Sequence, residues 1–90
     1  MDPYITPDGV FRVEFNCFEM RMSHWVENPR VTHVPSGRVV FDRWGTMEDA
    51  TPRVDAQGRL VLAMREYPGS SPGWNVLFDP KDGSHTVIHE

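Results

Sequence analysis

The stretch "RLVLAMREY" at residues 59–67 decides the fold class. Leu60, Leu62 and Met64 fall on one face of an extended chain, and the residues between them fall on the other. This two-residue period is that of a strand with one face in a core, because apolar positions of a helix recur every three to four residues. The preceding "DAQG" (55–58) ends in a glycine, which supplies the positive φ angle of a tight hairpin turn. We expect the domain to be built from such turn-and-strand units.

Three more turn signals of this kind occur, "TPDG" (6–9), "PSG" (35–37) and "DPKDG" (79–83), each followed by a short apolar run. The prolines lie between or at the margins of these runs, as expected for a residue that cannot donate to a central ladder. Only "DRWGTMEDA" (42–50) allows about one helical turn. The sequence therefore predicts an all-β fold of seven or eight antiparallel strands in a meander-like sandwich or partly open barrel, with at most one short helical turn.

The longest apolar run, residues 10–26, contains a change in its alternation. Its apolar residues share one parity at Phe11, Val13, Phe15 and Cys17 and the other at Phe18, Met20, Met22 and Val26. One extra residue at this point, a β-bulge, would return all of them to one face. Fully extended, the run would measure about 56 Å at ~3.3 Å per residue, well beyond the ~30 Å diameter of a globule of this size. We therefore predict one bent strand with a bulge near Cys17–Phe18.

The polar part of this run, "EMRMSHW" (19–25), holds the residue types from which active sites are built. On one strand Ser23 and His24 point to opposite faces, so they cannot act as a nucleophile and its base. In the row that faces outward, Glu19 and Arg21 form either a surface ion pair worth about 0–1 kcal/mol or part of a binding face. The candidate binding residues are Glu19, Arg21, Ser23 and Trp25 in this row, with Trp44 and Tyr67 beside it; no catalytic residue is predicted.

Size and charge limit the classes of function. Ninety residues form one domain, spanning 1–90, with one core. The net charge of −4 comes without a basic cluster, which argues against nucleic acid and suits a basic protein partner. No apolar run approaches the ~20 residues of a membrane span, and the first residues lack a signal-peptide pattern. We expect a cytoplasmic protein that does not contact membranes.

No metal or cofactor is expected. Cys17 is the single cysteine, which excludes a disulfide within the chain. In a strand His85 and His89 lie about 13 Å apart, too far to share a zinc ion whose ligands lie at ~2 Å. "GSSPG" (69–73) matches a hydrolase nucleophile pattern, but the chain is too short for the sheet that this pattern needs.

Two stretches carry a resemblance to known proteins. "EMRMSHWVENP" (19–29) and "LAMREYPG" (62–69) resemble a group of small bacterial all-β proteins that share an E-M-R-M-S-H-W strand and a later L-x-L-R-x-Y-P-G strand end. Ala63 and Met64 depart from the second motif. The resemblance implies a small cytoplasmic bacterial β protein, and it implies no activity or catalytic residue.

These features favour a non-enzymatic protein-binding module. An immunity-type inhibitor of a bacterial toxin is the most concrete version, because an acidic surface suits a basic toxin. The alternative is a small ligand-binding domain or enzyme with a polar pocket around Glu19, Arg21 and Tyr67. A homodimer is compatible with both hypotheses.

Overall fold

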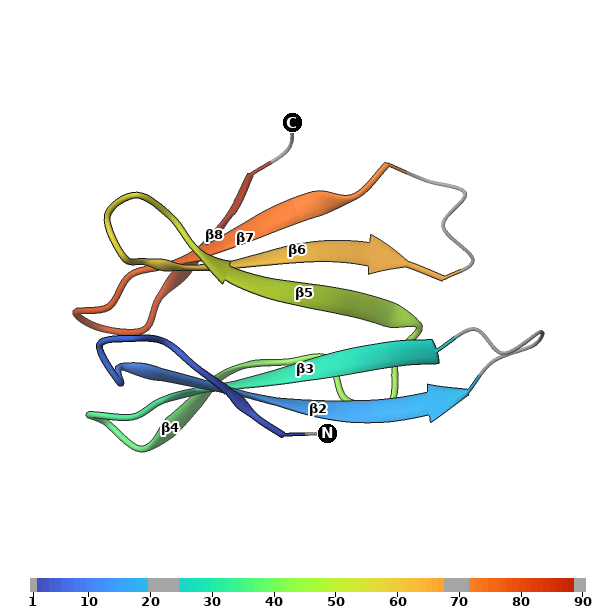
Figure 1. Cartoon of the computed structure of the whole chain (residues 1–90), viewed down its shortest axis with the longest axis horizontal. Coiled ribbons are helices and arrows are strands. Elements are labelled where there is room, and N and C mark those ends of the chain that lie inside the picture. Colours follow the sequence, from blue (N-terminus) through green and yellow to red (C-terminus); the bar gives the residue numbers. More distant parts are fainter. Residues whose placement is uncertain (1, 20–24, 68–71, 89–90) are drawn as a thin grey trace.

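Two four-stranded antiparallel sheets form the fold in the computed structural model, which describes residues 2–19, 25–67 and 72–88 (Figure 1). Every strand pairs with a neighbour in sequence, and the described residues contain no helix. The prediction of an all-β meander with seven or eight strands is confirmed, with eight. Sheet A contains β1 (Tyr4–Ile5), β2 (Phe11–Glu19), β3 (Trp25–His33) and β4 (Arg38–Asp42); sheet B contains β5 (Glu48–Val54), β6 (Leu60–Glu66), β7 (Trp74–Phe78) and β8 (His85–Ile88).

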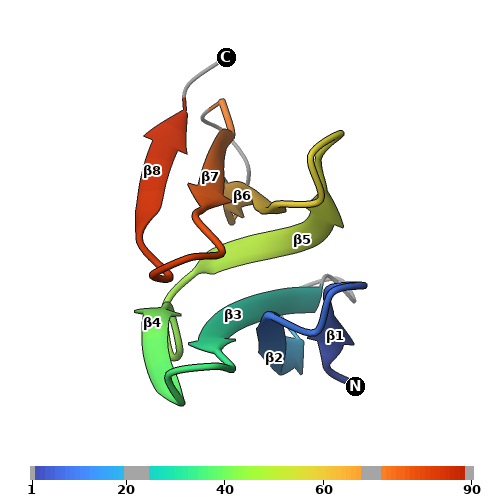
Figure 2. The same ribbon diagram turned by 90° about the vertical axis from the view of Figure 1, so that its left-hand side faces the viewer.

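The core lies between the two sheets, which Figure 2 shows as two layers. Phe78 of sheet B joins them, because its ring lies 5.6 Å from the rings of both Phe11 and Phe41 of sheet A. Every Asp, Glu, Lys and Arg that the structure describes is at least partly exposed. Leu60, Leu62 and Met64 belong to this core as predicted, whereas Val61, on the other face of the strand, is also buried. The buried core residues are Phe11, Val13, Val31 and Phe41 from sheet A, and Ala50, Leu60, Leu62, Met64, Val76 and Phe78 from sheet B.

The long bent strand predicted for residues 10–26 is wrong, because this segment belongs to two strands. β2 ends at Glu19, β3 begins at Trp25, and these two residues lie opposite each other in an antiparallel ladder. The ladder has no register shift, so the bulge predicted at Cys17–Phe18 is also wrong. Cys17 and Phe18 are adjacent in β2 and therefore face opposite sides of the sheet, and Phe18 shares its side with its partner Val26 of β3. The predicted orientations of residues 20–24, including Arg21 and Ser23, lie outside the described residues.

A register shift does occur in sheet A, between β3 and β4. Arg30 pairs with Asp42, but Thr32 pairs with Val39, so β4 contains one additional residue, Val40, at this point. An extra residue of this kind is a bulge, which bends a strand and disturbs its ladder. The bulge therefore lies in an edge strand, not in the long strand where the sequence pattern predicted it.

Two prolines lie inside strands, contrary to the expectation, and neither removes a ladder hydrogen bond. The carbonyl of Pro29 in β3 accepts from the Arg43 N–H at 2.9 Å. Since the N and C=O of one strand residue point to the same edge, the Pro29 nitrogen faces away from β2. In β5 the Asp55 N–H donates to the Arg59 carbonyl, and alternation from this pair turns the Pro52 nitrogen away from β6.

A buried histidine connects sheet A to the turn between β7 and β8. His33 is 3% exposed, and its ring packs against Phe11 with centroids 5.5 Å apart. Its Nε2 lies 2.9 Å from the Pro80 carbonyl, which can only accept, so this nitrogen carries a proton. Its Nδ1 lies 2.9 Å from the Ser36 hydroxyl. The turn is therefore fixed against the end of β3.

Substitutions at Gly83 and at Gly58 can be compared to test the packing of the β7–β8 turn against β3. Both have positive φ angles, 80° and 78°. A Cβ atom at Gly83 would lie 2.9 Å from Val40 Cγ1 and 3.0 Å from His33 Cβ, whereas at Gly58 it would meet nothing within 4 Å. We expect Gly58→Ala to lower the free energy of unfolding by about 1–2 kcal/mol through its backbone. Gly83→Ala should cost about 1–3 kcal/mol more because it overpacks.

Urea denaturation of both variants measures the difference in the free energy of unfolding. Equal losses at the two positions would contradict the contact between this turn and β3.

Candidate functional site

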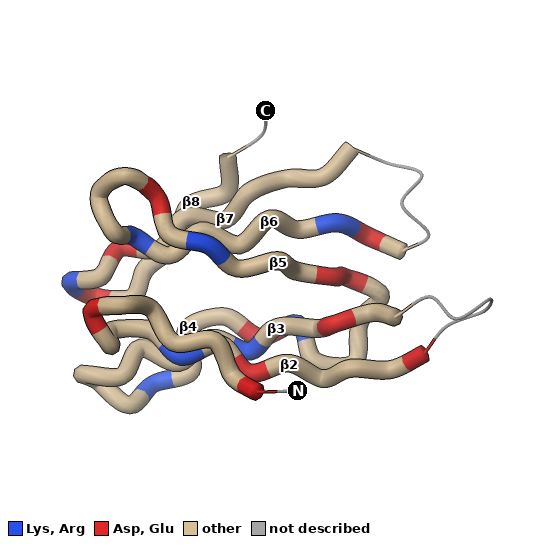
Figure 3. The backbone as a smooth tube through the Cα atoms, in the orientation of Figure 1, with Lys and Arg blue, Asp and Glu red and all other residues tan. Residues whose placement is uncertain are grey.

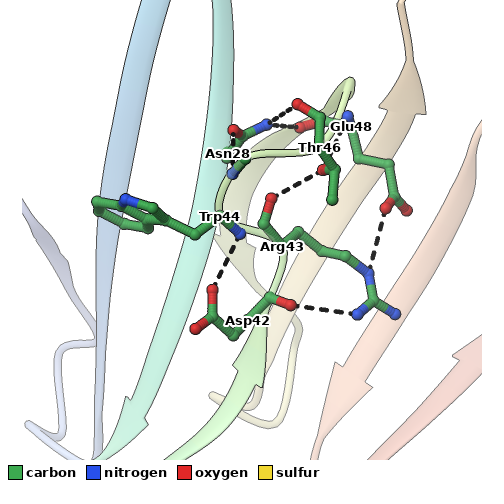
Figure 4. A network of polar contacts seen from close by, with 7 residues as sticks. Asn28, Asp42, Arg43, Trp44, Thr46 and Glu48 are labelled. Atoms are coloured by element: carbon green, nitrogen blue, oxygen red, sulfur yellow. Dashed lines mark hydrogen bonds and ion pairs between the residues drawn. The ribbon is translucent and has the colours of Figure 1, made fainter.

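The chain crosses from sheet A to sheet B through residues 43–47, and this crossing builds the candidate site (Figure 4). Asn28 of β3 holds the crossing and is fully buried. Its Nδ2 donates to the carbonyls of Thr46 at 3.0 Å and Glu48 at 2.6 Å. Its Oδ1 accepts from the Gly45 N–H at 3.1 Å. One side-chain amide therefore bonds two backbone groups of the crossing and one at the start of β5.

The crossing also bonds to itself (Figure 4). The Asp42 carboxylate accepts from the Trp44 N–H at 2.9 Å. The Thr46 hydroxyl donates to the Arg43 carbonyl at 2.7 Å, and Arg43 Nε lies 3.3 Å from a carboxylate oxygen of Glu48. These bonds fix the loop conformation before any partner arrives, which lowers the entropy lost on binding.

This network presents Trp44 on the outer face of sheet A. The Trp44 side chain is 39% exposed, and the guanidinium carbon of Arg30 lies 4.0 Å from its ring centroid. Arg30 Nε also lies 3.2 Å from an Asp42 carboxylate oxygen, and Glu14 is the cross-strand neighbour of Arg30 in β2. A cation over an exposed ring contributes about 0.5–1 kcal/mol. The result is a stacked Trp–Arg pair with acidic neighbours.

The predicted binding residues lie in two places. Glu19 and Trp25 face each other at the end of the β2–β3 ladder, and Trp25 is 58% exposed. Tyr67 directly follows β6, which ends on the same side of the molecule (Figure 1). Trp44 instead belongs to the crossing. The structure thus brings Glu19 and Trp25 together, whereas Arg21 and Ser23 lie outside the described residues.

Asn28 and Arg30, which carry the site, are absent from the residues predicted from the sequence. They flank Pro29 in "ENPR", and a proline beside polar residues is typical of a loop. A signal was present, because a short polar residue between the buried Val26 and Val31 needs hydrogen-bond partners. Those partners are backbone groups far along the chain, and no local pattern reveals them.

Acidic segments of β2, β3, β5 and β6 gather at the end opposite the glycine turns (Figure 3). The Glu27 N–H donates to an Asp49 carboxylate oxygen at 2.9 Å. Burial, and then the charge of Asp49, raise the pKa of Glu27 above its ordinary value of 4.5. Burial and Glu27 likewise raise the pKa of the Cys17 thiol. Arg65 lies 3.4 Å from Asp49 and offsets part of this charge.

Two further findings concern metals and membranes. Among the described residues, no group of three His, Cys, Asp or Glu side chains could hold a metal ion. His89, one half of the His85–His89 pair, lies outside them. The same part of the chain contains no helix of membrane-spanning length and hydropathy.

Comparisons with protein-family models, curated proteins and solved structures give no significant match to this chain. The resemblance of residues 19–29 and 62–69 to small bacterial β proteins therefore stays a prediction.

Replacing Asn28 tests the role of its amide. Asn28→Ala should lower the free energy of unfolding by at least about 2 kcal/mol, because each buried group left unpaired costs ~1–3 kcal/mol. Asn16, its cross-strand neighbour in β2, is partly exposed and gives the control. Asn16→Ala should cost only about 0.5 kcal/mol. Chemical denaturation measures both, and similar losses would show that the crossing does not depend on Asn28.

The raised pKa of Glu27 predicts a pH dependence of stability. The folded state holds this proton more tightly than the unfolded state, so stability falls as pH rises from 4.5 through the raised pKa. Glu27→Gln should therefore melt at a higher temperature than wild type at neutral pH, with no difference well below pH 4.5. Glu66→Gln removes the same charge from an exposed position and should change little. If the melting temperatures of Glu27→Gln and wild type changed with pH in the same way, the raised pKa of Glu27 would be contradicted.

Proposed function

We propose that this chain is a non-enzymatic protein-binding module whose contact surface is centred on Trp44 and Arg30. The observation that carries the proposal is that Trp44 remains 39% exposed although the loop that bears it is fixed by the buried amide of Asn28. Burying an amide is costly unless it is fully bonded. A rigid aromatic side chain loses little conformational entropy on binding and is a typical interface anchor.

The neighbours of Trp44 support a protein partner. Arg30 belongs to a cross-strand row with Glu14 and Asp42, and the adjacent row on the same face contains Ile5 and Arg12. Ile5 is 56% exposed and Arg12 is also exposed. Aromatic and Arg side chains in the centre with polar and apolar residues around them match the composition of protein interfaces.

Charge indicates the kind of partner. The chain carries a net charge of −4, and burial, and then the nearby charge of Asp49, raise the pKa of Glu27. A basic partner would relieve the repulsion between these two carboxylates and would be steered by the negative field. We therefore propose a basic protein as the partner, an immunity-type inhibition of a bacterial toxin as the most concrete role, and the cytoplasm as the location.

The alternative function is a ligand-binding domain or enzyme with a pocket around Glu19, Arg21 and Tyr67. Three surface depressions, of about 260, 380 and 430 Å³, are lined by other described residues. The exposed position of Glu19 and Trp25 suits an open contact face better than an enclosed site. The alternative therefore ranks second.

The test compares the binding of variants that fold equally well. Candidate partner proteins are first screened for binding to the immobilised chain, and the products of neighbouring genes are screened first. Trp44→Ala should weaken its affinity about 30-fold or more, as for a central interface residue. Val34→Ala, at an exposed apolar position in the β3–β4 turn, should leave affinity unchanged.

Calorimetric titration gives the affinities, and thermal melting verifies that both variants stay folded. Unchanged binding by Trp44→Ala would refute this contact surface. If Trp25→Ala alone weakened binding, the surface would lie instead at the end of the β2–β3 ladder.

A further inference from the structure

Three of the four sheet edges carry features that prevent pairing with another chain. β1 has two residues and lies between Pro3 and Pro7. β4 contains the additional residue Val40. β5 contains Pro52, whose nitrogen faces the free edge, and it packs against β3. Short length, bulges, proline and cover are the devices by which β proteins avoid edge-to-edge association.

The fourth edge, β8, is also short, with four described residues, but it contains no bulge and no proline. His85–Ile88 contains no proline, Lys, Arg, Asp or Glu, and its last three residues are β-branched. Among the described strands it pairs with β7 alone, in an unbroken register. All of its side chains are exposed, with Val87 at 47% and Ile88 at 41%. An uncharged strand of high β propensity is therefore open along one edge.

The hydrogen-bond pattern shows which backbone groups this edge offers. The Asp79 N–H donates to the Ser84 carbonyl at 2.8 Å. Bonded pairs recur at every second residue of an antiparallel ladder, so the even-numbered residues of β8 bond to β7. The N–H and C=O groups of His85 and Val87 consequently point to the free edge. Another strand can take these groups as its partners.

We propose that β8 pairs with β8 of a second copy of this chain, antiparallel about a two-fold axis at Thr86. The two copies of sheet B then form one continuous sheet. In this register His85 lies opposite Val87 of the second copy, so the free groups of both residues are bonded. Such an interface uses the same surface on both chains, which is the commonest symmetry of protein dimers. The pairing uses a different surface from Trp44 and does not rest on the proposed function.

The lack of charge in β8 and its self-complementary register favour a second copy as the occupant. The chain has a net charge of −4, which opposes self-association over most surfaces, but β8 brings no formal charges together. Self-pairing places Thr86 opposite Thr86, a cross-strand pair that can form a hydrogen bond. Beside β8, a depression of about 430 Å³ lined by Arg38, Val40 and His85 leaves room for side chains of the second copy. β4 and β8 lie on this same side of the sandwich (Figure 2).

Sedimentation equilibrium over about a hundredfold range of concentration tests the proposal. The wild-type chain should change from monomer to dimer. Thr86→Lys places two like charges opposite each other at the two-fold axis and should raise the dimer dissociation constant at least about tenfold. Thr51→Lys makes the same change at an exposed position of β5, at the opposite edge of sheet B, and should leave dimerisation unchanged.

A second pair of variants tests the backbone directly. Val87→Pro removes an N–H that faces the free edge, where proline is tolerated, so the chain should fold and remain monomeric. Val87→Ala retains this N–H and should still dimerise. Melting curves establish that each variant is folded. A wild-type chain that stays monomeric at every concentration overturns the proposal. The partner of this edge would then be a strand of another protein. A dimer that survives both Thr86→Lys and Val87→Pro also overturns it.

Discussion

The buried amide of Asn28 fixes how the two halves of this chain meet. Residues 43–47 are the covalent connection between the sheets, and the amide bonds three backbone groups of this segment and the start of β5. At the other end of β3, His33 contacts the Pro80 carbonyl of sheet B. The apolar core supplies most of the stabilisation, but hydrophobic attraction has no direction. These two polar contacts, with the bond from the Glu27 N–H to Asp49, therefore give the placement of the sheets its direction.

Features that depend on neighbouring residues could be predicted from the sequence. The alternation of Leu60, Leu62 and Met64 and the turn at Gly58 are both present, because period and turn chemistry act locally. The reversal between Glu19 and Trp25 could not be predicted, since residues 20–24 contain no Gly, Pro, Asn or Asp. Without a turn signal, two paired strands have the same pattern as one long strand.

The candidate site depends on contacts that no local pattern contains. Trp44 could be selected because an aromatic residue in a polar loop is conspicuous, and its role in binding stays a prediction. Asn28 could not be selected, because its partners lie 17 to 20 positions further along the chain. The stacking of Arg30 on Trp44 likewise follows only once the crossing is placed. The type of a side chain indicates which interactions it can make, and the topology of the fold determines which residues become its partners.

Each sheet is an uninterrupted half of the chain, in which every strand pairs with its neighbour in sequence. Pairing of this kind closes only short loops, so each ladder can form at a small entropic cost. Contacts of high sequence separation, which slow the folding of many β proteins, are confined here to the docking of one half on the other. We therefore expect the docking of the two sheets to be the slow step of folding, with the contacts of Asn28 and His33 forming only in that step.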